Sequence, residues 1–329
     1  MACASLIAAM HNNLVPDYPP TGAPKSTTSI VGMAPKCKLL PIKHAWESGY
    51  LNSSSAETAI RYAILNDASI INYSYSIFAS SDNLEAIIDS AYNNGRSGLG
   101  TIIVFAAGNY TPFSSYNILP PADLPTVLCV GGVWDNDNWW QLSCYGDSID
   151  LVATSADVWC WDRMDSLGRN PLYMAQGQCE PINRVHYLCY ADGTSLAAPL
   201  VAGAAALALS RRPDLTAAEV FDVLKYSADT LLNDTIHPPD PYYGYGRVNA
   251  FKALLAVCRG DANNDGTIDM LDISYIINWQ YYEGPAPYPD ELLGDANCDG
   301  IVNIFDITFI GSYLYSGGDE PPICFEYNE

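Results

Sequence analysis

The chain has 329 residues, 49% of them hydrophobic, and a formal net charge of −22. This apolar content suffices for a large core, and the length leaves room for one large domain and one small one. The excess of acidic residues argues against nucleic-acid binding. It favours binding of divalent cations, or simply a role of the charge in solubility. No window offers the roughly 18 apolar residues of a membrane span, because Pro199 and Gly203 interrupt the longest apolar run.

Strands and helices alternate along residues 1–256. Helices are expected from small or helically spaced apolar residues at 2–10, 55–66 and 84–94, and from a Thr216–Glu219 capping box that opens a helix to about Ala228. Strands are expected at 37–43, 69–76, 101–109, 125–133 and 143–153, and a last helix starts near 244–250. The run 101–109 is apolar throughout, as in a strand buried on both faces. The alternation predicts an α/β fold with a doubly wound, mostly parallel sheet.

Ten cysteines form no tight Cys-x-x-Cys pair. The even count favours disulfides in an oxidising, extracellular compartment over a zinc site. The segment 154–190 contains Trp159, Trp161, Cys160, Cys179 and Cys189, which favours a surface loop cross-linked by a disulfide.

The most informative stretch is 191–203, where a loop runs into an apolar helix with Ser195 at the junction. Taken alone, Ser195 fits an ordinary helix-capping serine, although unpaired N–H groups there also suit a nucleophile. The run Gly-Thr-Ser-x-Ala-x-Pro-x-Val-Ala-Gly resembles the nucleophile segment of subtilisin-like serine peptidases. Asn109 ends the strand at 101–109 and alone suits a turn, but its Ala-Ala-Gly-Asn context resembles the same family's oxyanion segment.

The resemblance implies a subtilisin-like fold over residues 1–256 and peptide-bond hydrolysis by acyl transfer. Ser195 would be the nucleophile, Asn109 the oxyanion donor, and a polypeptide substrate would lie along Ser74, Tyr75, Ser76 and Gly108. Ser76 and Ile77 stand where the family usually has glycines, which alters the specificity pocket.

Two catalytic positions are missing from the sequence. Residues 2–10 resemble the family helix that follows His-Gly-Thr, and Met1 stands about where that threonine belongs. We therefore expect the catalytic histidine and aspartate upstream of Met1, and the chain as given to be inactive. The N-terminus also lacks the basic region of a signal peptide. None of the chain's own histidines lies in a matching context: His11, His44, His186 and His237.

A repeat follows in residues 257–329. Two twelve-residue loops begin 34 residues apart, with oxygen-bearing side chains at positions 1, 3, 5, 9 and 12 and glycine at position 6. Such a loop is an oxygen cage for a hard cation, with position 7 offering its backbone carbonyl. The expected ligands of two Ca²⁺ are Asp261, Asn263, Asp265, Thr267, Asp269 and Asp272, then Asp295, Asn297, Asp299, Ile301, Asn303 and Asp306.

Aspartate at position 12 and no clear helix before either loop make the repeat resemble a type I dockerin, a small all-α calcium module. The resemblance implies a cohesin-like partner bound through loop positions 10 and 11, here Met270-Leu271 and Ile304-Phe305. Cys298 or Cys258 is a suitable disulfide partner for Cys324, and spacing does not choose between them.

Three functions follow from these patterns. The first is a secreted subtilisin-like endopeptidase attached through its calcium module, and the second is an inactive binding protein with the same fold. The third is a calcium-dependent scaffold component in which the first domain is a passenger.

Overall fold

A parallel four-stranded sheet forms the centre of the large domain in the computed structural model, which describes residues 2–10, 31–43, 53–75, 80–110, 116–161, 188–231 and 238–325. The strand order is β1-β2-β3-β4 and all three pairings are parallel. The strands are β1 (Ile70–Tyr73), β2 (Ile102–Ala106), β3 (Leu128–Val133) and β4 (Leu151–Thr154). The predicted doubly wound α/β fold is therefore confirmed.

Alternate residues of β2 pack into two separate hydrophobic cores, one on each face of the sheet. Ile102 and Val104 pack into the core with α5 (Thr194–Arg211), α6 (Ala217–Tyr226) and α7 (Ala250–Val257). Ile103 and Phe105 pack into the core with α2 (Ser53–Leu65) and α3 (Asp82–Asn94). Successive side chains of a strand point to opposite faces, so an unbroken apolar run matches a strand covered on both sides.

The central helix is α5, which packs against the sheet, α7 and α1 (Ala2–Ala8). By length and composition α5 is also the one helix among the described residues that is apolar enough to cross a membrane. Of its 18 residues, 61% are buried inside the molecule. This burial matches a core helix built from alanine, glycine and valine, small residues that allow close approach of its neighbours.

Two of the expected strands differ from the structure. Residues 37–43 form no strand, and Leu39 and Leu40 are 46% and 43% exposed. A strand needs a hydrogen-bonded neighbour, and no strand of the described chain lies beside this segment. The segment 143–153 is a strand only at β4, because its first half turns back to bridge Asn109 through Ser143. Within the insert, β5 (Val158–Trp161) and β6 (Leu188–Ala191) form an antiparallel pair that sets Cys160 opposite Cys189, whereas Cys179 lies outside the described residues.

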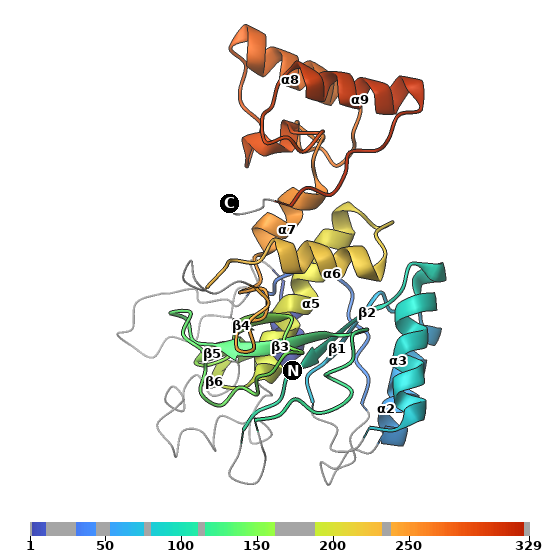
Figure 1. Ribbon diagram of the computed structural model, residues 1–329, viewed down its shortest axis with the longest axis vertical. Coiled ribbons are helices and arrows are strands. Elements are labelled where there is room, and N and C mark those ends of the chain that lie inside the picture. The colour runs from blue at the N-terminus through green and yellow to red at the C-terminus, as the bar shows by residue number, and fades with distance from the viewer. Residues whose placement is uncertain are drawn as a thin grey trace, which may run out of the picture.

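The repeat builds a small helical module with its own core. Figure 1 shows α8 (Met270–Tyr282) and α9 (Ile304–Ser316) beyond α7, at the end of the molecule away from the sheet. Ile276 of α8 and Ile310 of α9 are fully buried in this core, and the single-turn η4 (Glu291–Gly294) precedes the second loop.

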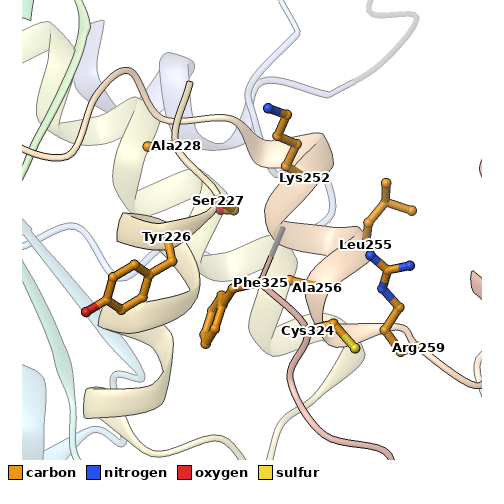
Figure 2. Close-up of a pocket in the computed structure, with 9 residues that line it drawn as sticks. All are labelled: Tyr226, Ser227, Ala228, Lys252, Leu255, Ala256, Arg259, Cys324 and Phe325. Atoms are coloured by element: carbon orange, nitrogen blue, oxygen red, sulfur yellow. The ribbon is translucent and has the colours of Figure 1, made fainter. Parts of the chain in front are cut away.

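The C-terminal tail fastens this module to the large domain. Cys324 forms a disulfide with Cys298, so the structure selects Cys298 over Cys258. The Cys324 backbone N–H donates to the Ala256 carbonyl at 3.1 Å, and the Phe325 ring lies 5.2 Å from the Tyr226 ring. Figure 2 shows these tail residues in a pocket formed with α6 and α7.

Candidate functional site

Ser195 is the second residue of α5, directly after a glycine in an unusual conformation. Gly193 has φ 138° and ψ 146°, a region that side-chain-bearing residues rarely adopt. Its N–H donates to the Ser155 carbonyl at 2.7 Å, and its carbonyl accepts from the Leu196 N–H at 2.9 Å. These contacts fix where the helix begins and hence where Ser195 lies.

Thr194 holds Asn109 in a single orientation. The Asn109 side-chain oxygen accepts from the Thr194 N–H at 2.9 Å and from the Thr194 hydroxyl at 3.0 Å. The same hydroxyl accepts from the Gly108 N–H at 3.2 Å, and Thr194 is fully buried. With its oxygen engaged in this way, the Asn109 amide nitrogen faces Ser195.

Gly193 lies close to both Ser195 and Asn109. A Cβ built on Gly193 would lie 3.0 Å from Ser195 Oγ, 3.3 Å from Asn109 Nδ2 and 3.7 Å from the Ser195 backbone N. One hydroxyl and two nitrogen donors therefore lie together beside Gly193, and a side chain at this position would crowd them. This arrangement suits addition of a serine oxygen to a carbonyl whose oxygen is held by two donors.

The amino end of α1 lies against the same site. Pro199 lacks the N–H that would bond to the Ser195 carbonyl within the helix. The Cys3 thiol donates to that carbonyl instead, with Sγ 3.2 Å from the oxygen. Residues immediately before Cys3 are therefore close to the Ser195 loop.

The other predicted peptidase residues fall partly inside the described chain. Ser74 and Tyr75 follow β1, and Gly108 and Asn109 follow the neighbouring parallel strand β2. All four residues therefore lie at the carboxyl ends of the strands. The Ser74 hydroxyl accepts from Asn72 Nδ2 at 2.9 Å, and Tyr75 is exposed. Ser76, Ile77 and the four histidines lie outside the described residues.

The two repeat loops have matching internal hydrogen bonds. In the first loop, Asp261 accepts from the Asp265 and Gly266 N–H groups, and Asp272 accepts from the Asn263 and Asp269 N–H groups. In the second loop, Asp295 and Asp306 accept from the backbone of 297–303 in the same way. Within the residues that the structure describes, no three carboxylate, imidazole or thiol groups converge as they do around a metal ion.

The loops nevertheless fit a hard cation by their chemistry. All side-chain donors are oxygens, and the carboxylates at positions 1 and 12 are buried: Asp261, Asp272, Asp295 and Asp306. Burial raises the pKa of Asp272 to about 6 and also raises the pKa of Asp306. Buried carboxylates are costly unless a cation or hydrogen bonds compensate them, which is what bound calcium provides.

An arginine approaches the first carboxylate of each loop. Arg211, the last residue of α5, forms an ion pair with Asp261. Arg259 lies 3.8 Å from Asp295, and both side chains are buried. The first loop is thus in direct contact with the helix that carries Ser195.

Residues 1–246 match the model of the subtilase family of S8 peptidases, and residues 259–315 match the type I dockerin domain. The chain belongs to the subtilase family. It is 32% identical to subtilisin DY of Bacillus licheniformis over 225 residues, which are 68% of this chain and 70% of that protein. It is 29% identical to the thermophilic serine proteinase of Bacillus sp. strain AK1 over 70% of this chain and 48% of that protein.

A further subtilase relative is the calcium-dependent protease of Nostoc sp., which is 30% identical over 68% of this chain and 37% of its own length. Two solved structures share the fold at 25% identity. They are MycP1 with its N-terminal propeptide removed (TM-score 0.56, 77% of this chain and 78% of that chain) and a protease from Pseudoalteromonas arctica (TM-score 0.58, 78% and 70%). The matched part therefore spans less than two thirds of several relatives.

Sequence reasoning missed three residues of this subtilase chain that the structure places at its sites. Thr194 and Gly193 belong to the Gly-Thr-Ser motif, but nothing in their spacing from Asn109 reveals that they orient it. Arg211 is a helix-terminal arginine like many others, and only the packing of the module on α5 brings it to Asp261.

Proposed function

We propose that this chain carries the Ser195 half of a secreted serine endopeptidase site. Ser195 Oγ would add to a substrate carbonyl, while Asn109 Nδ2 and the Ser195 N–H hold the oxyanion. One such donor is typically worth about 10² to 10³ in rate. The observation that supports this most is that Ser195 Oγ and Asn109 Nδ2 lie together beside Gly193, 3.0 Å and 3.3 Å from the position that a Cβ on Gly193 would take.

The base and its orienting carboxylate would precede Met1 on the polypeptide. The contact of Cys3 with the Ser195 carbonyl supports this, because a residue just before α1 would lie beside the nucleophile. Without both groups the rate should fall by about 10⁴ to 10⁶, so the chain of 329 residues should be nearly inactive.

Chemical rescue tests this proposal. The full chain is incubated with a fluorophosphonate probe, with and without added imidazole as a diffusible base. We expect slow labelling that imidazole accelerates and that Ser195→Ala abolishes, whereas Ser210→Ala at the other end of α5 leaves it unchanged. Fast labelling without imidazole would mean that the base lies within this chain. No Ser195-dependent labelling under either condition would favour the inactive binding protein.

The second proposed activity is calcium-dependent attachment through residues 257–329. Each loop would bind one Ca²⁺, which would neutralise the buried carboxylates and fix the positions of α8 and α9 relative to each other. The first loop has four carboxylates and the second three, so the first should bind more tightly by charge alone. Calorimetry on the full chain should give two calcium sites. One site or none would contradict the predicted set of oxygen ligands in the two loops.

The partner would be a cohesin-like domain outside the cell. Met270, Leu271, Ile304 and Phe305 are apolar side chains exposed at the amino ends of α8 and α9, which suits them to contact with a protein partner. Leu271→Glu with Phe305→Glu should abolish capture by an immobilised cohesin panel, as should a chelator. Tyr282→Glu at the far end of α8 is the matched control and should bind normally. Capture that survives the double variant would place the interface elsewhere.

A further inference from the structure

Residues 257–329 contain a single basic residue, Arg259, among many aspartates and glutamates. Its side chain is only 3% exposed, although a charged group is costly to bury unless an opposite charge or hydrogen bonds compensate it. Arg259 follows α7 and lines the same pocket as the tail residue Cys324 (Figure 2). The one basic side chain of the module is therefore inside it rather than on its surface.

Arg259 precedes the first loop by two residues but makes its contacts at the second loop. Its Nη1 donates to the Leu292 carbonyl at 2.6 Å and lies 3.8 Å from Asp295 Oδ2. The next residue, Gly260, donates its N–H to the Leu293 carbonyl at 2.8 Å. The carboxylate at position 1 of the second loop thus faces a positive charge that the backbone ahead of that loop holds in place.

The module has no other basic residue for its first loop, and the large domain supplies one. Arg211, at the end of α5, forms an ion pair with Asp261, whose side chain is only 4% exposed. The repeat itself does not create these pairs, because the residue that corresponds to Arg259 ahead of the second loop is Leu293. Each position-1 carboxylate therefore pairs with an arginine from outside its own loop.

The buried carboxylates at position 12 are compensated by the backbone alone. Asp272 and Asp306 each accept two N–H groups of their own loop, at 2.8 to 3.2 Å. At position 1 such bonds are joined by a guanidinium. Removal of one member of a buried ion pair leaves the other charge uncompensated, so the arginines matter most for Asp261 and Asp295.

We propose that Arg211 and Arg259 are built-in counter-ions that keep the two loops, and with them α8 and α9, folded where calcium is scarce. Each guanidinium supplies at position 1 part of the positive charge that Ca²⁺ would bring to the loop. Because Arg211 belongs to the large domain, the fold of the module at low calcium depends on its contact with α5. The counter-ion role rests on the proposed function only in that it takes both loops to be calcium sites.

Hydrogen exchange on the full chain tests the counter-ion role. The exchange rates of the Ile276 and Ile310 amides, in the core of the module, are measured in excess chelator and in millimolar calcium. The two variants are Arg259→Met, which keeps an unbranched side chain in the buried position, and Arg211→Gln.

In chelator we expect slow exchange at both amides of the unchanged chain. Exchange should be about tenfold faster in Arg259→Met, which leaves Asp295 buried without its partner. It should be about threefold faster in Arg211→Gln, because the Arg211 side chain is 24% exposed and its pair is weaker. Calcium should restore slow exchange in both variants. Arg212→Gln is the matched control and should behave like the unchanged chain, since Arg212 contacts neither loop carboxylate but pairs with Asp214 and Glu320.

A double variant separates charge from packing. Arg259→Met combined with Asp295→Asn removes both charges, so its exchange in chelator should be slower than that of Arg259→Met alone. Equal exchange in these two variants would overturn the counter-ion role, as would fast exchange of the unchanged chain in chelator or slow exchange in Arg259→Met. If Arg259→Met exchanges fast and calcium does not slow it, the counter-ion role is supported and calcium binding by the loops is contradicted.

Discussion

Thr194 shows how much of the Ser195 site depends on one buried hydroxyl. Its side chain is fully buried and joins the Gly108 N–H to the Asn109 oxygen. A buried donor and acceptor that lose their partner keep the full cost of desolvation. The orientation of Asn109, and with it the proposed oxyanion site, would therefore depend on a buried residue behind the site.

We predict that Thr194→Val destabilises the large domain by about 1 to 3 kcal/mol. It should also slow the imidazole-assisted labelling of Ser195, because Asn109 is no longer held. Urea unfolding measures the first effect and labelling the second. Thr58→Val is the control, since the Thr58 hydroxyl bonds only to the Ser54 carbonyl on the exposed side of α2. Unchanged stability and labelling in Thr194→Val would contradict the role assigned to Thr194.

At the scale of elements, Asp229 anchors the start of α7. Its carboxylate accepts from Asn249 Nδ2 at 2.9 Å and from an Arg247 nitrogen at 3.1 Å, and it lies 3.2 Å from Lys252 Nζ. Partial burial raises the pKa of Asp229, but these donors outweigh it and leave the pKa below its usual value. Asn249 is also the N-cap of α7, so one carboxylate fixes the cap and its neighbours.

A carboxylate whose pKa is lowered by folding stabilises the fold at pH values above its pKa in the unfolded chain, which is about 3.9 for aspartate. This stabilisation is lost as the pH falls through the pKa in the folded chain. Asp229→Asn should therefore cost about 1 to 2 kcal/mol at pH 7 and much less near pH 2. The measurement is urea unfolding at both pH values. Asp222→Asn on the exposed face of α6 should have little effect at either pH. A cost that is the same at pH 7 and pH 2 would show that charge is not responsible.

Elements defined by local signals were predictable from the sequence. The capping box of Thr216 and Glu219 starts α6 as expected, and the apolar run 101–109 contains β2. Residues 37–43 have strand composition, but a strand depends on a hydrogen-bonded neighbour that local sequence does not reveal. The choice of Cys298 for the disulfide depends on where the tail passes the second loop, which is likewise a tertiary property.

At the scale of the whole molecule, Arg211 connects the peptidase helix to the first calcium loop. Its guanidinium contacts Asp261, an expected ligand, and would thus compete with a bound cation for the same carboxylate. Arg211→Gln should raise the calcium affinity of the first loop about tenfold, since one unit charge near a protein surface is worth about 1 to 4 kcal/mol at contact distance. Arg212→Gln is the control, because Arg212 pairs with Asp214 and Glu320 instead. Calorimetry should show that only the first change tightens binding, and equal affinities would contradict the competition.

The Cys298–Cys324 disulfide should be a main support of the module. It closes a loop over a sequence separation of 26, and by chain entropy such a cross-link contributes about 3 kcal/mol. Replacing both cysteines by alanine should lower the unfolding midpoint of residues 257–329 in chelator and leave the large domain nearly unchanged. Replacing buried Cys129 by alanine should instead affect the large domain. An unaltered module midpoint would show that the core of Ile276 and Ile310 suffices.

The helix α5 carries Ser195 at one end and Arg211, the contact to the module, at the other. They are 16 positions apart in the helix, about 24 Å along its axis. A molecule held by its module on a surface or an assembly would therefore present the Ser195 end of α5 outward, on the side opposite the attachment. Bulky, folded or insoluble proteins could then approach Ser195 without meeting the anchor, and crowding of neighbouring modules would restrict rotation of the large domain rather than access to Ser195.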